Sequence, residues 1–172
     1  MAKSRPASTA VAMVNAKGYT VPFPVEDYDR IPKARGHELD ISFKHAVEIT
    51  RTIRGMPLPA AKVFLEDVID KRAAVPVKRF NRGVPHRKGT GFGAGRYPLK
   101  AAGAILQVLL NAENNAEVFG LDPEELRVKH IAAHKGAGWM GHTPRAHGRS
   151  TARKRDRVNV EVVLESTEAT EG

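Results

Sequence analysis

Histidine is the residue type in this chain that most readily suggests metal chemistry, because the chain has seven histidines and no cysteine. His130 and His134 lie in a segment with strand-like alternation, where a spacing of four places them on one face about 13 Å apart. That is too far for both to bind one ion, and His142 and His147 flank a predicted turn without an evident third ligand. We therefore predict no metal site, and no thiolate or disulfide chemistry.

The glycine-rich segment Gly89–Arg96, GTGFGAGR, suggests the binding of a nucleotide phosphate, since it fits the spacing G-x-G-x-x-A. That motif needs a buried strand before it, a helix starting at its last small residue and an acidic residue about twenty positions on. Here VPHRK precedes it, no helix starts there, and the later position falls in Asn111–Asn115. No Lys-Ser or Lys-Thr pair closes it as in a P-loop. We predict no nucleotide cofactor.

Nucleophilic catalysis is the third chemistry to consider, because Ser150 and Thr151 lie near His147. A catalytic set also needs a group that orients the base, often a carboxylate, and the surrounding segment contains only Asp156. We therefore predict that the chain is not an enzyme. A nucleotide-dependent enzyme built around Gly89–Arg96 remains an alternative, which tight binding of a mononucleotide or dinucleotide would support.

Positive charge is segregated along the 172 residues, whose formal net charge is +9. Lys71–Lys100 contains nine of the 28 Lys and Arg residues and no acidic residue, and Arg127–Arg157 contains nine more with Asp156 alone. Such clustering costs self-repulsion and indicates a polyanionic partner. The alternative, a solvated basic surface, is typical of interspersed charges.

Length and composition favour one globular domain with extensions, since 41% of the residues are hydrophobic. No apolar run reaches membrane-spanning length, and the N-terminal residues lack the uninterrupted apolar region of a signal peptide. We expect a cytoplasmic protein.

Three helices are predicted from apolar residues at helical spacing. The first is capped by Ser42 and ends at Gly55, the second has Pro59 in its first turn, and the third runs from Pro98 to about Val118. The two short helices should form an antiparallel or angled pair. Residues 73–97 between the second and third helices have no stable period, and we predict a basic loop there.

Strands are predicted on both sides of a glycine-rich and basic stretch. Leu126, Val128, His130 and Ala132 alternate with Arg127, Lys129 and Ile131. Val158–Leu164 alternates more regularly, and Gly36–Ile41 gives a short further strand. The simplest connection is a hairpin whose turn lies near TPRAHG. The predicted fold is α+β, with three helices packed on a small antiparallel sheet and a long protruding β-hairpin.

Several segments of the chain are similar to one family, in the same order. They are ISFKHAVEITRTIRGMPLPAAKVFLEDV, AAGAILQVLLNAENNAE and LRVKHIAAHKGAGWMGHTPRAHGRSTARKRDRVNVEVVLE, and they resemble the universal large-subunit ribosomal protein L22 family (L17 in eukaryotic naming). The most specific piece is PRAHGR, which looks like the family's P-R-A-x-G-R at its hairpin. RGVPHRKGTGFGAGRYP resembles an insertion of archaeal and eukaryotic members. The resemblance covers roughly residues 34–166.

The resemblance implies a structural protein of the large ribosomal subunit that binds rRNA and has neighbouring ribosomal proteins as partners. It also implies a hairpin whose tip lines the nascent-peptide exit tunnel, near the nascent polypeptide. The residues between Lys135 and Pro144 are less basic than in many bacterial members, which leaves open which side chains face the tunnel.

The predicted rRNA-binding residues are cations of the two basic segments, which would reach phosphates: Lys78, Arg79, Arg82, His86, Arg87, Lys88, Arg96, Lys135, Arg145, Arg149, Arg153, Lys154, Arg155 and Arg157. The tunnel-lining tip that the resemblance implies consists of Trp139, Met140, Gly141, His142, Thr143, Pro144, Arg145, Ala146 and His147. Phe80 and Phe92 would stack on unpaired bases or pack onto the body, two alternatives that the sequence leaves open.

The expected organisation is an extended N-terminal tail (1–33), a single α+β domain (34–166) with the basic loop 73–97 and the hairpin arm 136–156, and a flexible acidic tail (167–172). A two-stranded ribbon with like charges is marginal in water, so the arm needs a partner. The rival function is architectural DNA binding with the ribbon in a groove, which a preference for duplex DNA over rRNA would favour.

Overall fold

The computed structural model describes residues 13–15, 18–24, 31–89 and 91–166. At its centre is a three-stranded antiparallel sheet in the order β3 (Lys33–Leu39), β9 (Val158–Ser166) and β6 (Leu126–Lys135). The predicted α+β fold is confirmed. The strand expected at Gly36–Ile41 is β3, which starts three residues earlier than predicted. The expected acidic tail, 167–172, lies outside the described residues.

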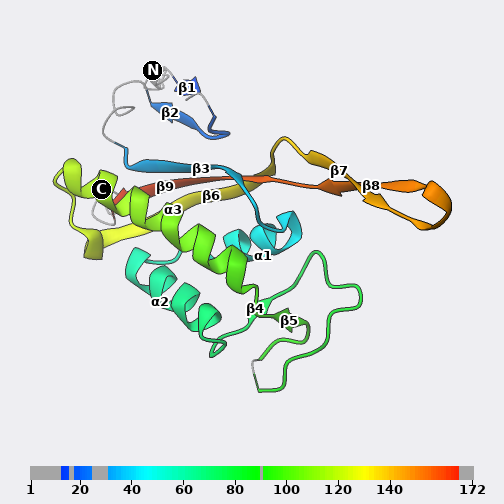
Figure 1. Cartoon of the computed structure of the whole chain (residues 1–172). Helices are drawn as coiled ribbons and strands as arrows, with labels where there is room; N and C mark the ends of the chain where they lie inside the picture. Colours follow the sequence, from blue (N-terminus) through cyan, green and yellow to red (C-terminus); the bar gives the residue numbers. More distant parts are fainter. Residues whose placement is uncertain (1–12, 16–17, 25–30, 90, 167–172) are drawn as a thin grey trace, which may run out of the picture.

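Three helices cover one face of this sheet (Figure 1). They are α1 (Phe43–Ile53), α2 (Leu58–Ile69) and α3 (Leu99–Val118). α1 lies on β6 and α3 crosses β3 and β9, whereas α2 packs mainly on α3. The short turn between α1 and α2 therefore does not make those two helices each other's main neighbours. Among the described residues, no helix combines the length and the apolar character needed to cross a membrane.

The helix ends follow the sequence closely, with one exception. Gly55 has a φ of +81° and ends α1, and its N–H donates to the carbonyl of Val128 on β6 at 2.8 Å. Pro59 lies in the first turn of α2 as predicted. Ser42 occupies the N-cap position of α1, but its side chain makes no capping hydrogen bond, so that part of the prediction was wrong.

The core lies between the sheet and the helices. From β9 it takes Val158, Val160, Val162 and Leu164, all buried, as the alternation predicted. It is completed by apolar residues of the three helices, such as Ile49, Leu65 and Ile105, and by β6. The aliphatic side chains of β9 therefore form the part of the core that faces α3 and α1.

On β6 the predicted alternation was wrong beyond Val128. Val128 pairs with Leu164 and His130 pairs with Val163, so a β-bulge at Lys129 interrupts the register. The bulge turns Ile131 into the core and moves His130 to the opposite face of the sheet. A shift of one residue reverses every later side chain, which strict alternation in the sequence did not reveal.

The hairpin arm continues from the central sheet as a separate ribbon (Figure 1). Its strands are β7 (Trp139–Pro144) and β8 (Ser150–Arg155), in register from Trp139 opposite Arg155 to Pro144 opposite Ser150. A short 3₁₀ turn, η2 (Ala146–Gly148), closes the end where the sequence placed the turn. The protruding hairpin is therefore confirmed.

Three smaller features complete the chain. β1 (Met13–Asn15) pairs with β2 (Pro22–Pro24), on the side of the sheet away from the helices (Figure 1). β4 (Val75–Pro76) pairs with β5 (Gly95–Arg96) and closes the base of the basic loop. The 3₁₀ turn η1 (Pro123–Glu125) connects α3 to β6, where the sequence predicted a turn.

Candidate nucleic-acid interface

A buried carboxylate holds the base of the basic loop. Glu48 of α1 is 2% exposed and accepts hydrogen bonds from three successive backbone N–H groups, those of Lys78, Arg79 and Phe80, at 3.1, 2.8 and 2.9 Å. Bonds to an ionised acceptor are stronger than neutral ones. With the backbone fixed in this way, the side chains of Lys78 and Arg79 are exposed to solvent.

The rest of the loop folds back on itself. A bridge joins His86 to Ala94, and the N–H of Arg87 donates to the carbonyl of Gly93 at 2.8 Å. The described part of the glycine-rich segment therefore forms one side of an irregular hairpin. Within the described residues no strand leads directly into this segment and no helix begins at Ala94, its last small residue, as a dinucleotide site requires.

Of the loop residues predicted to contact rRNA, all but one present exposed side chains: Lys78, Arg79, Arg82, His86, Lys88 and Arg96. Arg87 is half-buried, because its Nε donates to the carbonyl of Gly95 at 3.1 Å and its guanidinium lies 5.0 Å from the ring centroid of Tyr97. Arg87 thus supports the loop from within.

The cations of the hairpin arm lie on an exposed ribbon: Arg145, Arg149, Arg153, Lys154 and Arg155. Within the described residues, no carboxylate forms an ion pair with Arg145, Arg149 or Arg153. The nearest acid, Asp156, lies 3.6 Å from Lys135 and 3.8 Å from Lys154. Arg157 is half-buried and donates to the carbonyl of Glu38 at 3.3 Å, so it fastens the arm's base to β3.

Other cations of the segments Lys71–Lys100 and Arg127–Arg157 form ion pairs with carboxylates on the body. Arg127 and Lys129 reach Glu165 at 3.2 and 2.7 Å, and Arg72 reaches Asp67 at 3.2 Å. Burial acts to raise the pKa of the Glu165 carboxyl, but Lys129 and Arg127 outweigh it and hold that pKa below its usual value. The excess positive charge therefore lies on the loop and the arm.

Trp139 lies where the ribbon begins, opposite Arg155, and η2 lies at the other end. It is 56% exposed, and Met140 is 57% exposed. A Cβ on Gly141 would lie 2.6 Å from the indole, so the ring covers this glycine on one face of β7. The tip itself is formed by Arg145–Arg149, with His147 and Gly148 in left-handed conformation at φ of +57° and +67°.

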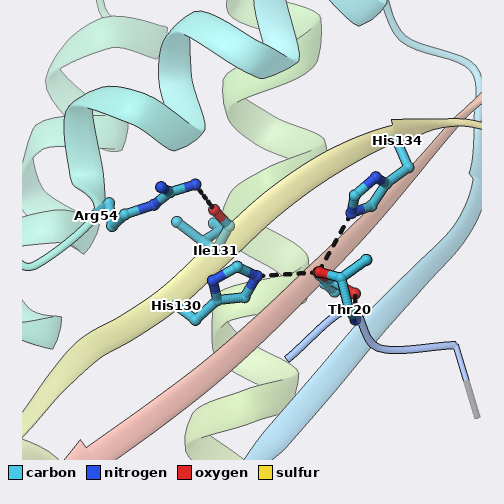
Figure 2. Close-up of polar contacts among 6 residues, drawn as sticks. Thr20, Arg54, His130, Ile131 and His134 are labelled. Carbon is cyan, nitrogen blue, oxygen red and sulfur yellow. Dashed lines mark hydrogen bonds and ion pairs between the residues drawn. The ribbon is translucent and has the colours of Figure 1, made fainter. Parts of the chain in front are cut away.

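Sequence reasoning missed a basic face on the body between the two segments. Lys44 and Arg51 of α1 and Arg54 at its C-cap are exposed, and Arg51, Arg54 and Arg79 line a groove beside β6. Arg54 also donates to the carbonyl of Ile131 at 2.7 Å (Figure 2). The prediction used only the apolar residues of this helix. The cations recur at helical spacing on its solvent-exposed face.

A second missed feature is a buried carboxylate on the opposite face of the sheet. Glu161 is 1% exposed and lies opposite Ala132, so His130 and His134 flank it along β6. Their Nε2 atoms lie 3.0 and 3.2 Å from its Oε1, and the N–H of Thr20 donates to its Oε2 at 3.0 Å. Figure 2 shows both rings converging beside Thr20.

These contacts give the two histidines a structural role. Burial acts to raise the pKa of the Glu161 carboxyl, but hydrogen bonds from Thr20, His130 and His134 outweigh it and lower that pKa. Thr20 also donates from its hydroxyl to Oε1. In the part of the chain that the structure describes, no three acidic or histidine side chains gather in a way that would hold a metal ion.

Comparison with known proteins identifies the family. Residues 34–165 match the model of ribosomal protein L22p/L17e. The large ribosomal subunit protein uL22 of Methanosphaera stadtmanae is 49% identical over 150 residues, which cover 87% of this chain and 97% of that protein. The uL22 of Methanopyrus kandleri is 51% identical over 149 residues, which cover 86% and 94%.

Members of this family are structural components of the ribosome and not enzymes, and the relatives matched here are archaeal. The chain belongs to the ribosomal protein L22p/L17e family and is a structural constituent of the large ribosomal subunit.

Proposed function

We propose that the chain binds large-subunit rRNA with its basic loop, its hairpin arm and the basic face of α1. The observation that carries this proposal is the distribution of ion pairs. Arg72, Arg127 and Lys129 on the body have carboxylate partners, whereas Arg145, Arg149 and Arg153 of the arm form no ion pair with any described residue. Such cations gain most from phosphate, because no internal bond is lost on binding.

The salt dependence of rRNA binding tests this proposal. Eight engaged phosphates give a slope of about −6 to −7 in a plot of log K against log salt concentration. Replacing Arg145, Arg149 and Arg153 by Gln together should make the slope shallower by about 2 to 3. Arg72→Gln, which removes a paired cation of the body, should leave it unchanged.

Two outcomes would refute rRNA binding. One is an affinity for rRNA that does not change with salt, and the other is a preference for duplex DNA over folded rRNA at equal phosphate. The second outcome would favour a role as an architectural DNA-binding protein.

We further propose that the end of the arm lines the nascent-peptide exit tunnel. The arm projects from the body as a ribbon without a second layer, which suits insertion between rRNA segments. A photo-crosslinker at His147 in assembled, translating subunits should react with the nascent chain, and one at Lys62 on the body should not. Crosslinks from His147 to rRNA alone would argue against tunnel lining.

A further inference from the structure

A groove with two phenylalanine rings lies where the basic loop, α1 and the base of the arm meet. Phe43 of α1 and Phe80 of the loop pack edge to face, with ring centroids 6.4 Å apart. The groove has a volume of about 820 Å³ and is open to solvent, and the buried side chain of Ile41 contributes to its wall. Neither basic segment alone forms this site.

Five cations surround these rings, and one of them is Arg79, whose guanidinium carbon lies 5.5 Å from the ring centroid of Phe80. Lys44 Nζ lies 5.8 Å from the ring centroid of Phe80, and Lys135 Nζ lies 5.6 Å from that of Phe43. Lys100 and Arg155 line the same groove.

Two carboxylates also line the groove, and each has a lysine partner. Lys100 reaches Asp40 at 2.6 Å and Lys135 reaches Asp156 at 3.6 Å. Lys44 and Arg155 form no ion pair with any carboxylate in the described residues. The groove therefore combines aromatic surface with excess positive charge.

We propose that this groove binds one unpaired nucleotide of the rRNA, with its base against Phe80 and Phe43 and its phosphate on Lys44 and Arg155. The inference rests on the proposed rRNA binding and goes beyond it by naming a site for a base. A duplex hides the faces of its bases, so only a nucleotide turned out of a helix reaches the rings. Rings and cations together suit a nucleotide better than a phosphate alone.

The lysines over the rings explain how the site is filled. Lys44 and Lys135 have long, solvent-exposed side chains, so moving their ammonium groups away from the rings costs little packing energy. An incoming base replaces the lysine ammonium on each ring face, and the Lys44 ammonium moves to the phosphate of the same nucleotide. An RNA strand that runs between the basic loop and the arm passes this groove, since the groove lies between them.

The test uses the full chain and deproteinised archaeal large-subunit rRNA. Phe80→Leu, which keeps apolar bulk and removes the ring, should weaken binding by about 5- to 150-fold. Its salt slope should not change, because no charge is removed. Phe80→Tyr should bind as wild type does. Phe119→Leu is the matched control, because Phe119 is 45% exposed at the C-terminal end of α3 and lies outside the groove.

Chemical probing of the rRNA adds a readout that a merely structural role of Phe80 does not change. One unpaired nucleotide should be protected by the wild type and by Phe80→Tyr, and exposed with Phe80→Leu. If wild-type protein protects no unpaired nucleotide, or Phe80→Leu binds with wild-type affinity, the inference is overturned while rRNA binding stands. If wild-type protein shows no salt-dependent binding, the proposed function itself fails.

Discussion

Two buried acidic residues fix extended segments to the body of this basic protein. Glu48 accepts three backbone N–H groups at the start of the basic loop, and Glu161 joins Thr20 of the N-terminal segment to His130 and His134 of β6. Every buried polar side-chain atom in the described residues has a hydrogen-bond partner. The carboxylates therefore position the segments without leaving unpaired charge in the core.

Glu48→Gln tests the first of these contacts. A glutamine side chain of the same shape keeps one acceptor oxygen and turns an NH₂ group toward one of the three N–H donors. We expect the free energy of unfolding to fall by about 1–3 kcal/mol. Urea denaturation measures the loss, and hydrogen exchange at Lys78–Phe80 should accelerate. Glu66→Gln on the exposed face of α2 is the control, and an equal loss in both variants would contradict the assigned role.

Protonation of Glu161 should lower the free energy of unfolding of the chain at acid pH. Its pKa in the folded chain is lowered, so the folded state binds fewer protons than the unfolded state around the unfolded pKa of about 4.3. The stabilisation is present above that unfolded value and is lost as the pH falls through the lower, folded pKa.

Comparison of wild type with Glu161→Gln measures this effect. The difference in unfolding free energy should be largest near pH 7 and should shrink as the pH falls below about 5. Glu117→Gln, an exposed position on α3, should show a difference that does not vary in this way. A Glu161→Gln difference that stays constant from pH 7 to about 3.5 would exclude the pH dependence.

At the scale of elements, the sequence predicts what short-range patterns determine. The three helices, the two strands of the hairpin and the turn between them follow from apolar periodicity, Gly55, Pro59 and the TPRAHG segment. The bulge at Lys129 depends on pairing with Val163 and Leu164 of β9, which lie more than thirty residues further along the chain. Local alternation gives no information about such pairing. For this reason the sequence predicted His130 on the core face of the sheet and Ile131 on the opposite face, whereas the structure has the reverse.

The candidate site divides in the same way. Cations of the loop and the arm are visible in the sequence as blocks of charge, whereas the groove between Phe43 and Phe80 joins residues of α1, loop and arm that only the fold brings together.

Val163 of β9 is 1% exposed on the face away from the helices because Tyr19 and Ile31 pack against it. Alternation on β9 gave no indication that the N-terminal segment covers this face.

A pair of glycine substitutions tests how closely α3 packs on β3. A Cβ on Gly36 would lie 2.8 Å from Leu39 Cδ1 and from Val108 Cγ2, so Gly36→Ala should destabilise the chain by about 1–3 kcal/mol. Gly103→Ala has no heavy atom beyond its own helix backbone within 4 Å of the new methyl group, and should stabilise by up to about 1 kcal/mol. Thermal unfolding measures both, and the same sign for both would contradict the packing described.

On the scale of the whole molecule, the fold separates a stable body from segments that depend on a partner. The body has a core between sheet and helices, whereas β7 and β8 form a ribbon with no second layer and mostly exposed side chains. A two-stranded ribbon gains little from its own packing, and this one places several cations close together. The conformation of the arm should therefore become fixed on assembly, while the body folds alone.

Trp139 reports on this assembly because it is the only tryptophan in the chain and rRNA contains none. In the free protein its indole is 56% exposed over Gly141, so acrylamide should quench it readily. Bound rRNA should cover the face of the ribbon that carries Trp139 and the cross-strand Arg153 and Arg155, and the dynamic quenching constant from fluorescence lifetimes should fall.

The matched control moves the reporter to the body. A Trp139→Phe, Val118→Trp double variant places the single tryptophan at the last residue of α3, where Val118 is 83% exposed. The C-terminal end of α3 lies away from the arm (Figure 1). Its quenching constant should not change on binding. If Trp139 is quenched equally in the free and bound protein, the ribbon is not enclosed by rRNA, even when the loop and α1 bind. Because lifetimes separate collisional access from direct quenching by bases, this result bears on the placement of the arm itself.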